Sequence, residues 1–177
     1  MEQSRKEFRD SKWFTRGWTL QELLAPEWVL FFDRNWTFVG RKSTNSVTEH
    51  ELASQISNIT NIAVEYLQKY YLAKGACVAV KMSWVSKRQT SRSEDTAYCM
   101  LGIFDVNMPL LYGEGRKAFF RLQSEIIKQS NDESVFAWIV DPNKDAGGQQ
   151  ISGLFAPTPI CFAESGTVER LDMQRPP

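Results

Sequence analysis

The chain has 177 residues, 42% of them hydrophobic, and its 21 lysines and arginines are balanced by 21 aspartates and glutamates. This length and composition suit one compact domain, or one domain and a fragment of another. A formal net charge of zero gives no electrostatic reason to expect a nucleic-acid or membrane partner. No apolar run approaches the roughly 20 residues that cross a bilayer, so we expect neither partner.

The cysteines and the single histidine limit the kinds of metal and catalytic site that the chain can form. Cys77, Cys99 and Cys161 are widely spaced and odd in number, as is typical of reduced thiols. Residues 1–10 are polar and lack the apolar core of a signal peptide, so we expect a cytoplasmic protein. His50, the single histidine, cannot build a His/Cys metal cluster, and it leaves no Ser-His-Asp triad. We therefore expect no metal site.

A short helix is predicted around Thr19. Thr19 followed three residues later by Glu22 is a capping-box pattern, in which each side chain accepts a hydrogen bond from a backbone amide of the other residue. Pro26 disfavours helix before it, so at most two turns fit. Such a helix, with Arg16 just ahead of it, fits either a structural corner or the edge of an active site. Its apolar side chains must pack into a core: Trp18, Leu20, Leu23 and Leu24.

Three stretches are predicted as strands. Residues 28–33 are apolar on both faces, as in a buried strand, and Arg34-Asn35 can turn the chain into a second strand at 36–40. Residues 135–140 are rich in strand-forming side chains. We expect a small sheet formed by residues near 28–40 and 134–140.

Helical spacing of apolar residues predicts most of the remaining elements. Thr48 with Glu51 repeats the capping-box pattern, and Leu52, Ile56, Ile59 and Ala63 follow at helical spacing, with an interruption at Asn61 and a second helix that carries Val64 and Leu67. Helices are also expected over residues 77–87, 93–104 and 116–129, whereas 70–75 is expected as a connection. Ser93 is expected as an N-cap, and Arg121 with Glu125 as an i, i+4 ion pair. The predicted fold class is α/β, mixed and mostly helical, over residues 1–140, followed by a loop-rich C-terminal tail at 141–177.

Other local patterns favour structural roles. Lys87, Arg88 and Arg92 lie beside Glu94 and Asp95. This basic cluster could bind a phosphate or a partner, but salt bridges around a helix start are favoured. Gly113-Glu-Gly115 lacks the longer phosphate-loop pattern and is predicted as a turn. Cys99 lies within a helical pattern without a nearby base, so it is not expected to act as a nucleophile.

Two blocks of sequence resemble a known family. The first is Trp13–Pro26 (WFTRGWTLQELLAP); the second runs from Arg88–Tyr98 (RQTSRSEDTAY) through Leu101–Gly115 (LGIFDVNMPLLYGEG) to Phe120–Gln123 (FRLQ) and Phe136–Trp138 (FAW). In this order they closely resemble the fungal heterokaryon incompatibility (HET) domain and the segment after it, over most of residues 8–160. The family's upstream Ser-Tyr-x-Trp-Gly pattern does not occur, so the chain resembles the C-terminal half of such a domain.

The resemblance implies a cytoplasmic role in non-self recognition and programmed cell death. HET domains are similar to Toll/interleukin-1 receptor (TIR) domains, many of which cleave NAD with a glutamate in a Trp-x-x-x-Glu-Leu pattern, and Trp18–Leu23 matches that pattern. The resemblance therefore implies Glu22 as the catalytic carboxylate, Trp18 as a pocket wall and Arg16 as a phosphate ligand. NAD would be the substrate, and no resident cofactor is expected.

Two other classes of function stay open. The chain could be a non-enzymatic module that acts by homotypic HET–HET association, or an inactive, truncated family member. In the local alternative, Glu22 only closes the capping box, Trp18 belongs to the core and Arg16 is exposed. An enzyme requires an accessible Glu22 in a cleft, a binding module exposes an apolar patch of several hundred Å², and a truncated domain leaves open strand edges.

Overall fold

The computed structural model describes residues 2–43, 51–139 and 153–169. Its elements, in chain order, are α1 Glu2–Arg9, η1 Lys12–Thr15, α2 Thr19–Leu24, β1 Val29–Phe32, β2 Phe38–Lys42, α3 Ala53–Thr60, α4 Val64–Gln68, α5 Tyr70–Gly75, α6 Val78–Val85, α7 Asp95–Tyr98, α8 Leu101–Phe104, α9 Lys117–Gln129, η2 Glu133–Phe136, η3 Pro159–Phe162 and η4 Ser165–Thr167. The predicted class, mixed α/β and mostly helical with a small sheet, is confirmed for these residues.

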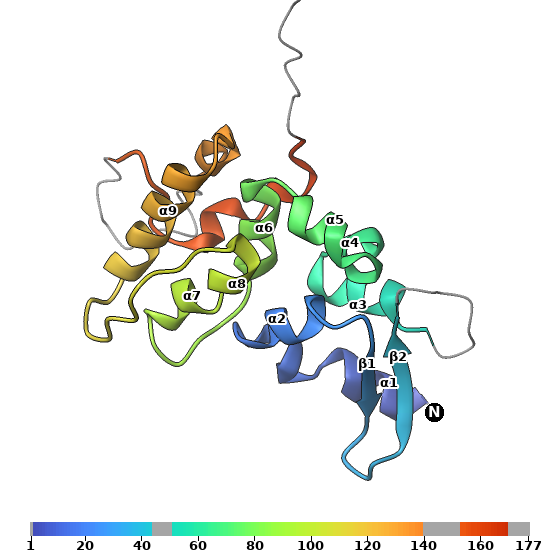
Figure 1. Cartoon of the computed structure of the whole chain (residues 1–177). Helices are drawn as coiled ribbons and strands as arrows, with labels where there is room; N and C mark the ends of the chain where they lie inside the picture. The colour runs from blue at the N-terminus through green and yellow to red at the C-terminus, as the bar shows by residue number, and fades with distance from the viewer. Residues whose placement is uncertain (1, 44–50, 140–152, 170–177) are drawn as a thin grey trace, which may run out of the picture.

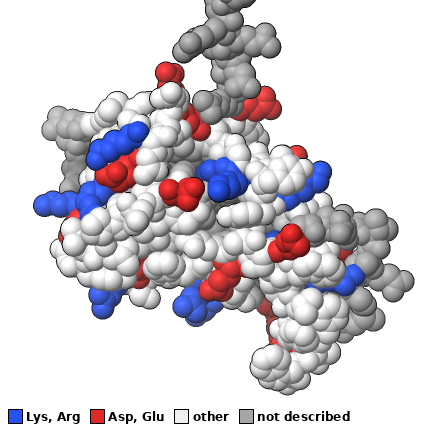
Figure 2. All heavy atoms as spheres, in the orientation of Figure 1, with Lys and Arg blue, Asp and Glu red and all other residues white. Residues whose placement is uncertain are grey.

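The elements form an elongated arrangement around one hydrophobic core. Figure 1 shows the β1–β2 hairpin with α1 at one end, α9 at the other, and α2 and α6 between them. Helix α6 is the most deeply buried element: all of its residues except Ser83 are buried. Charged side chains of both signs are scattered over the face in Figure 2, in keeping with the net charge of zero.

The predicted hairpin is confirmed. Strands β1 and β2 pair antiparallel, with Phe31 opposite Gly40 and an irregularity between Phe31 and Phe32. Asp33 orders the turn, because its carboxylate accepts hydrogen bonds from the amides of Asn35 (2.8 Å) and Thr37 (2.9 Å). The prediction that β1 is buried on both faces is wrong. Its side chains alternate between half-buried and exposed positions, so one face of the hairpin is open to solvent.

Two other sequence predictions are also wrong. Residues 133–136 form the 3-10 helix η2, which Asp132 caps by accepting from the Ser134 amide, and no third strand joins the sheet among the described residues. The first part of the predicted strand at 135–140 therefore turns instead of extending, and Val140 lies outside the described residues. Residues 70–75, expected as a connection, form helix α5.

Most of the other helical predictions hold. The capping box predicted from Thr48 lies outside the described residues at Thr48, and α3 begins at Ala53, with Leu52 at its N-cap position. Asn61 ends α3 in a left-handed conformation (φ 57°) before α4 begins, and α9 spans Lys117–Gln129. The helix predicted from Ser93 to Phe104 is divided in two, with Glu94 rather than Ser93 at its N-cap position. At Met100 the backbone changes to an i→i−3 hydrogen bond, since the Met100 amide donates to the carbonyl of Ala97, whereas the Cys99 amide still donates to the carbonyl of Asp95. This tighter turn separates α7 from α8.

The described part of the C-terminal segment packs onto α6 and α9. Gln123 of α9 is fully buried, and its side-chain amide both donates to the carbonyl of Ala156 (3.0 Å) and accepts from its amide (2.9 Å). Phe162 of η3 is fully buried in the same core. The predicted boundary between residues 140 and 141 lies outside the described residues.

Candidate functional site

Helix α2 is held at its C-terminal end by a buried lysine. Leu20, Leu23 and Leu24 bury its apolar face. Lys42 of β2 is 1% exposed, and its ammonium donates to the carbonyls of Leu23 (2.8 Å) and Pro26 (2.6 Å). These bonds satisfy carbonyls that a helix end leaves without partners. Burial lowers the pKa of Lys42 to about 8, although Glu51 opposes this shift.

The predicted capping box at the other end of α2 is wrong. Trp18, not Thr19, occupies the N-cap position, and its backbone is already helical. The Thr19 hydroxyl instead contacts the carbonyls of Trp13 and Arg16, and it accepts a hydrogen bond from Nη1 of Arg88 at 3.1 Å. A capping box needs an extended N-cap residue. The Glu22 carboxylate therefore does not accept the backbone hydrogen bond that a capping box requires.

The three residues proposed for NAD cleavage lie on the outer side of α2. Arg16 and Glu22 are exposed, and Trp18 is 40% exposed, so the alternative that places Trp18 in the core is wrong. The Glu22 carboxylate makes no hydrogen bond or ion pair with the residues that the structure describes. Four cavities are described, and the described residues that line them do not include Arg16, Trp18 or Glu22.

The first sequence block is joined directly to the start of the second. The Gly17 amide donates to the carbonyl of Gln89 (2.9 Å), and the Gln89 amide donates to the carbonyl of Thr15 (2.6 Å). A Cβ atom at Gly17 would lie 2.5 Å from Cγ2 of Thr90 and 3.0 Å from Sγ of Cys99. Only glycine allows this approach, so the two motifs that carry the family resemblance depend on each other structurally.

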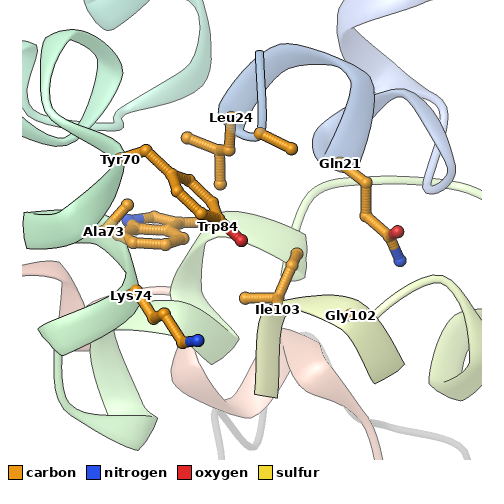
Figure 3. Close-up of a pocket in the computed structure, with 9 residues that line it drawn as sticks. Gln21, Leu24, Tyr70, Ala73, Lys74, Trp84, Gly102 and Ile103 are labelled. Atoms are coloured by element: carbon orange, nitrogen blue, oxygen red, sulfur yellow. The ribbon is translucent and has the colours of Figure 1, made fainter. Parts of the chain in front are cut away.

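A cavity of about 150 Å³ lies on the inner side of α2 (Figure 3). Gln21, the neighbour of Glu22, lines it, and its amide donates to the carbonyl of Cys99 at 2.6 Å. The described walls come from α2, α5, α6 and α8 and are mostly apolar: Leu24, Ala25, Tyr70, Ala73, Trp84, Gly102 and Ile103. Among the described lining residues, Lys74 is the one cation. The sequence interpretation did not single out Gln21; its place between buried leucines on a short helix was the available signal.

The second block is held together around Glu94. This buried carboxylate accepts from the amides of Gly113 (2.7 Å) and Gly115 (3.1 Å), both of which have positive φ. Its own backbone amide and those of the two glycines lower the pKa of Glu94 to about 2. Gly113–Gly115 is thus a turn, as predicted, and the acidic residue before α7 serves to fix it.

Tyr98 and Arg121 hold in place the segment of chain that leads to this turn. The Tyr98 hydroxyl donates to Glu114 (2.9 Å) and accepts from the Leu111 amide (2.7 Å). Arg121 forms an ion pair with Glu114 and donates to the carbonyl of Pro109. The predicted Arg121–Glu125 pair is therefore wrong, because the Arg121 guanidinium pairs with Glu114 instead.

The salt bridges predicted for the basic cluster do not occur among the described residues. Arg92 lies over the Tyr112 ring at 4.8 Å. Arg88 donates from Nε to the carbonyl of Trp84 (3.2 Å) and from Nη1 to the carbonyl of Arg16 (2.8 Å), while its Nη2 is buried without a partner among the described residues. Burial lowers the pKa of Arg88 to about 10, against the influence of Cys99.

The described residues do not favour a cysteine nucleophile, a metal site or a membrane-spanning helix. Burial raises the pKa of Cys99 to about 12, which disfavours the thiolate that a nucleophile needs. No group of three or more histidine, cysteine or acidic side chains in residues 2–43, 51–139 and 153–169 could hold a metal ion. Within the same ranges, none of the helices has the length and apolar character to cross a membrane.

Comparison with known proteins gives one relative. A 141-residue part of the chain, 78% of its length, is 42% identical to the vegetative incompatibility protein HET-E-1 of Podospora anserina. The match covers 10% of that protein. No family model and no solved structure matches the chain. The chain therefore contains a region related to a fungal vegetative incompatibility protein.

Proposed function

We propose that this chain acts in heterokaryon incompatibility, as part of a non-self recognition system that leads to programmed cell death. The observation that carries the proposal is the 42% identity to HET-E-1 over 141 residues. The hydrogen bonds between Gly17 and Gln89, and between Arg88 and Arg16, support it, because they join the two resembling blocks into one unit.

Inducible expression of the chain in a filamentous fungus tests this proposal. We expect growth arrest or cell death after induction, and no effect from a variant unable to fold. Folded chain that accumulates without affecting viability would contradict the proposal.

For the mechanism we propose cleavage of NAD at the nicotinamide–ribose bond, with Glu22 as the catalytic carboxylate. The bond between the anomeric carbon of the ribose and the pyridinium nitrogen breaks, and neutral nicotinamide leaves with the bonding electron pair. Water adds to the anomeric carbon and releases a proton to solvent, while the carboxylate stabilises the positive charge that develops on the sugar.

Glu22 supports this role because it is accessible and makes no hydrogen bond or ion pair among the described residues, and exposed Trp18 and Arg16 lie at the same end of α2, where they would contact the substrate's ring and phosphates. The four described cavities do not include these three residues, so the described part of the chain does not supply the cleft that an enzyme requires.

NAD consumption by the purified chain at high concentration tests the mechanism. We expect turnover by the wild type and a loss of about 10²-fold or more in Glu22→Gln, on the scale of removing one electrostatic stabiliser. Glu27→Gln is the matched control, because Glu27 is an exposed carboxylate that follows the same helix. Equal turnover in both variants would exclude Glu22, and no turnover by a folded wild type would exclude the mechanism for this chain.

A second candidate function is homotypic assembly, and the hairpin supplies the observation that favours it. Its outer face exposes five large apolar side chains, of which Trp36 is 83% exposed: Trp28, Leu30, Phe32, Trp36 and Phe38. The corresponding lobe in Figure 2 is largely uncharged. Among the described residues, the backbone of Val29–Phe31 pairs only with β2, so the outer edge of β1 is open. Two such β1 edges can pair antiparallel about a two-fold axis. We therefore propose that a second copy of the chain pairs with this edge and covers the exposed apolar face.

Sedimentation equilibrium over a range of concentrations tests this candidate. We expect the wild type to dimerise and the double variant Leu30→Thr/Phe32→Thr to remain monomeric. Leu110→Thr/Leu111→Thr is the control, because it removes two exposed leucines elsewhere on the surface and should still dimerise. A monomeric wild type at the highest soluble concentration would contradict assembly without bearing on NAD cleavage.

A further inference from the structure

The cavity on the inner side of α2 has a buried apolar floor and a mouth at the surface. Leu24, Ala73 and Trp84 form the floor and are at most 3% exposed, whereas Tyr70 is 41% exposed. In Figure 3 the side chains of Leu24, Tyr70 and Ile103 point towards one another from α2, α5 and α8. A molecule that enters would therefore exchange water for apolar surface, which favours binding.

The volume and the walls of the cavity limit its occupant to a small ring. The cavity measures about 150 Å³, and an apolar cavity of about this volume holds benzene in another protein. Tyr70 and Trp84 contribute aromatic rings to the wall, and aromatic rings pack well against each other. We therefore expect a molecule with one flat ring.

Gln21 presents an unused hydrogen-bond acceptor to this cavity. Its Nε2 donates to the carbonyl of Cys99 (2.6 Å), which fixes the orientation of the side-chain amide. Its Oε1 has no partner among the described residues, and it is accessible to solvent, since Nη2 of Arg88 is the one buried side-chain atom without a partner in that part of the chain.

A glycine leaves this acceptor open. Gly102 lines the cavity opposite Gln21, and a Cβ atom at Gly102 would lie 3.0 Å from Oε1 of Gln21, closer than to the Cδ and Nε2 atoms of the same amide. Oε1 is therefore the Gln21 atom nearest to the space that a side chain at position 102 would fill. A ligand that covers Oε1 without donating to it would leave a desolvated acceptor, which is costly.

Charge contributes little at the mouth of the cavity. Lys74 lies 3.9 Å from a carboxylate oxygen of Asp105, and the two side chains are 61% and 85% exposed. Exposed charges of this kind stabilise a contact only weakly. None of the described lining residues is acidic. The polar requirement of the cavity is thus the acceptor of Gln21 rather than a charge.

We propose that this cavity binds a small, neutral, monocyclic aromatic molecule that carries one hydrogen-bond donor. The ring packs against Leu24, Trp84 and Ile103. The donor bonds to Oε1 of Gln21. The inference does not depend on NAD cleavage or on assembly, because neither Glu22 nor the hairpin is among the described residues that line this cavity.

Isothermal titration of the chain with phenol tests the proposal. We expect saturable binding of phenol. Fluorobenzene has nearly the same shape without a donor, and it should bind at least about fivefold more weakly, as expected when an acceptor is covered and left unpaired. Cyclohexanol, which has a donor but no flat ring, and benzoate, which carries a negative charge, should also bind more weakly than phenol.

Gln21→Met removes the acceptor and retains an unbranched side chain of similar length. It should weaken phenol at least about fivefold and leave the affinity for fluorobenzene within about twofold, because the apolar walls remain. Gln68→Met is the matched control, since Gln68 is a half-buried glutamine that is not among the described lining residues. It should leave the affinity for phenol unchanged. Circular dichroism checks that both variants fold.

Gly102→Ala provides a second variant, which decides if Gln21→Met does not fold. The added Cβ partly covers Oε1 and should weaken phenol, whereas Gly75→Ala, where a Cβ meets nothing within 4 Å, should not. Absence of phenol binding by the wild type would overturn the proposal. So would equal or tighter binding of fluorobenzene, cyclohexanol or benzoate, or an unchanged affinity for phenol in a folded Gln21→Met variant.

Discussion

At the scale of single residues, the described part of the chain buries charges against backbone groups more often than against opposite charges. Glu94 accepts from glycine amides, while Lys42 and Arg88 donate to carbonyls. The pKa shifts have corresponding causes: hydrogen bonds lower the pKa of Glu94, and burial lowers those of Lys42 and Arg88. Each of these groups therefore makes stability depend on pH in a direction that can be predicted.

Glu94→Gln should remove part of the chain's loss of stability in acid. The pKa of Glu94 is about 2 in the folded chain, against an ordinary value of 4.5 for a free glutamate. Its contribution is therefore fully present above about pH 4.5 and is lost as the pH falls towards 2. Urea unfolding at pH 7 and at pH 3 should show that the variant is less stable than the wild type at pH 7, with a smaller difference at pH 3. A difference independent of pH would contradict the assignment.

Lys42→Met should change the alkaline behaviour. The pKa of Lys42 is about 8 in the folded chain, whereas a free lysine has an ordinary value of 10.5, so the unfolded chain binds more protons between these pH values. The wild type's free energy of unfolding should therefore rise, relative to that of the variant, as the pH increases from 8 to 10.5. Comparing the two proteins cancels the opposite contribution of Cys99, whose raised pKa is common to both. Parallel profiles would exclude a buried ammonium at this position.

At the scale of elements, the two resembling blocks are connected by close backbone approach. Segment 15–17 pairs with Gln89, and Arg88 donates to the carbonyl of Arg16. The tertiary bonds around Glu94 and Glu114 then fix the turn that leads into α9. These bonds explain structurally why short α7 and α8, which are too short to be stable alone, keep their conformation.

Gly17→Ala should destabilise the chain by roughly 1–3 kcal/mol, the usual cost of overpacking a close contact. The added Cβ would lie 2.5 Å from Cγ2 of Thr90, and neither backbone can withdraw without breaking the Gly17–Gln89 hydrogen bond. Gly75→Ala is the control, because a Cβ there meets nothing within 4 Å in helix α5, and alanine favours helix. Thermal denaturation should show a Tm below that of the wild type for Gly17→Ala but not for Gly75→Ala.

At the scale of the whole molecule, the described part of the C-terminal segment belongs to the same core as the helices before it. Phe162 and Ala156 are fully buried, and Ser165 donates to the carbonyl of Ala137. Such packing predicts that residues 153–169 unfold together with the rest of the domain rather than as a separate tail.

Phe162→Ala tests whether residues 153–169 unfold together with the rest of the domain. A buried phenylalanine replaced by alanine costs about 3–5 kcal/mol, and the loss should appear in the single unfolding transition of the whole chain. Leu154→Ala, at a position exposed in the same segment, should change stability by less than about 0.5 kcal/mol. A Phe162 variant with unchanged global stability would show that the segment is only an appendage.

Local patterns alone predicted a large part of this fold. The spacing of apolar residues located α3, α6 and α9, Asn61 marked a break, and strand-forming runs on either side of Arg34-Asn35 located the hairpin. These elements were predictable because a helix or a tight turn depends on neighbours within a few positions. The Gly113–Gly115 turn and the unsuitability of Cys99 as a nucleophile were also predictable, and the incompatibility resemblance agrees with the relative found.

Only the tertiary structure decided which side chains meet. Residues 135–139 do not form a strand because a strand needs a partner edge, and the capping box fails because Arg88, distant in sequence, shares the Thr19 hydroxyl. For the candidate site, the sequence named Glu22, whereas the fold turns Gln21 into the cavity beside α2 and leaves Glu22 outside. Adjacent helix positions point in directions about 100° apart, so the packing of α2 against the core determines which residue faces the cavity.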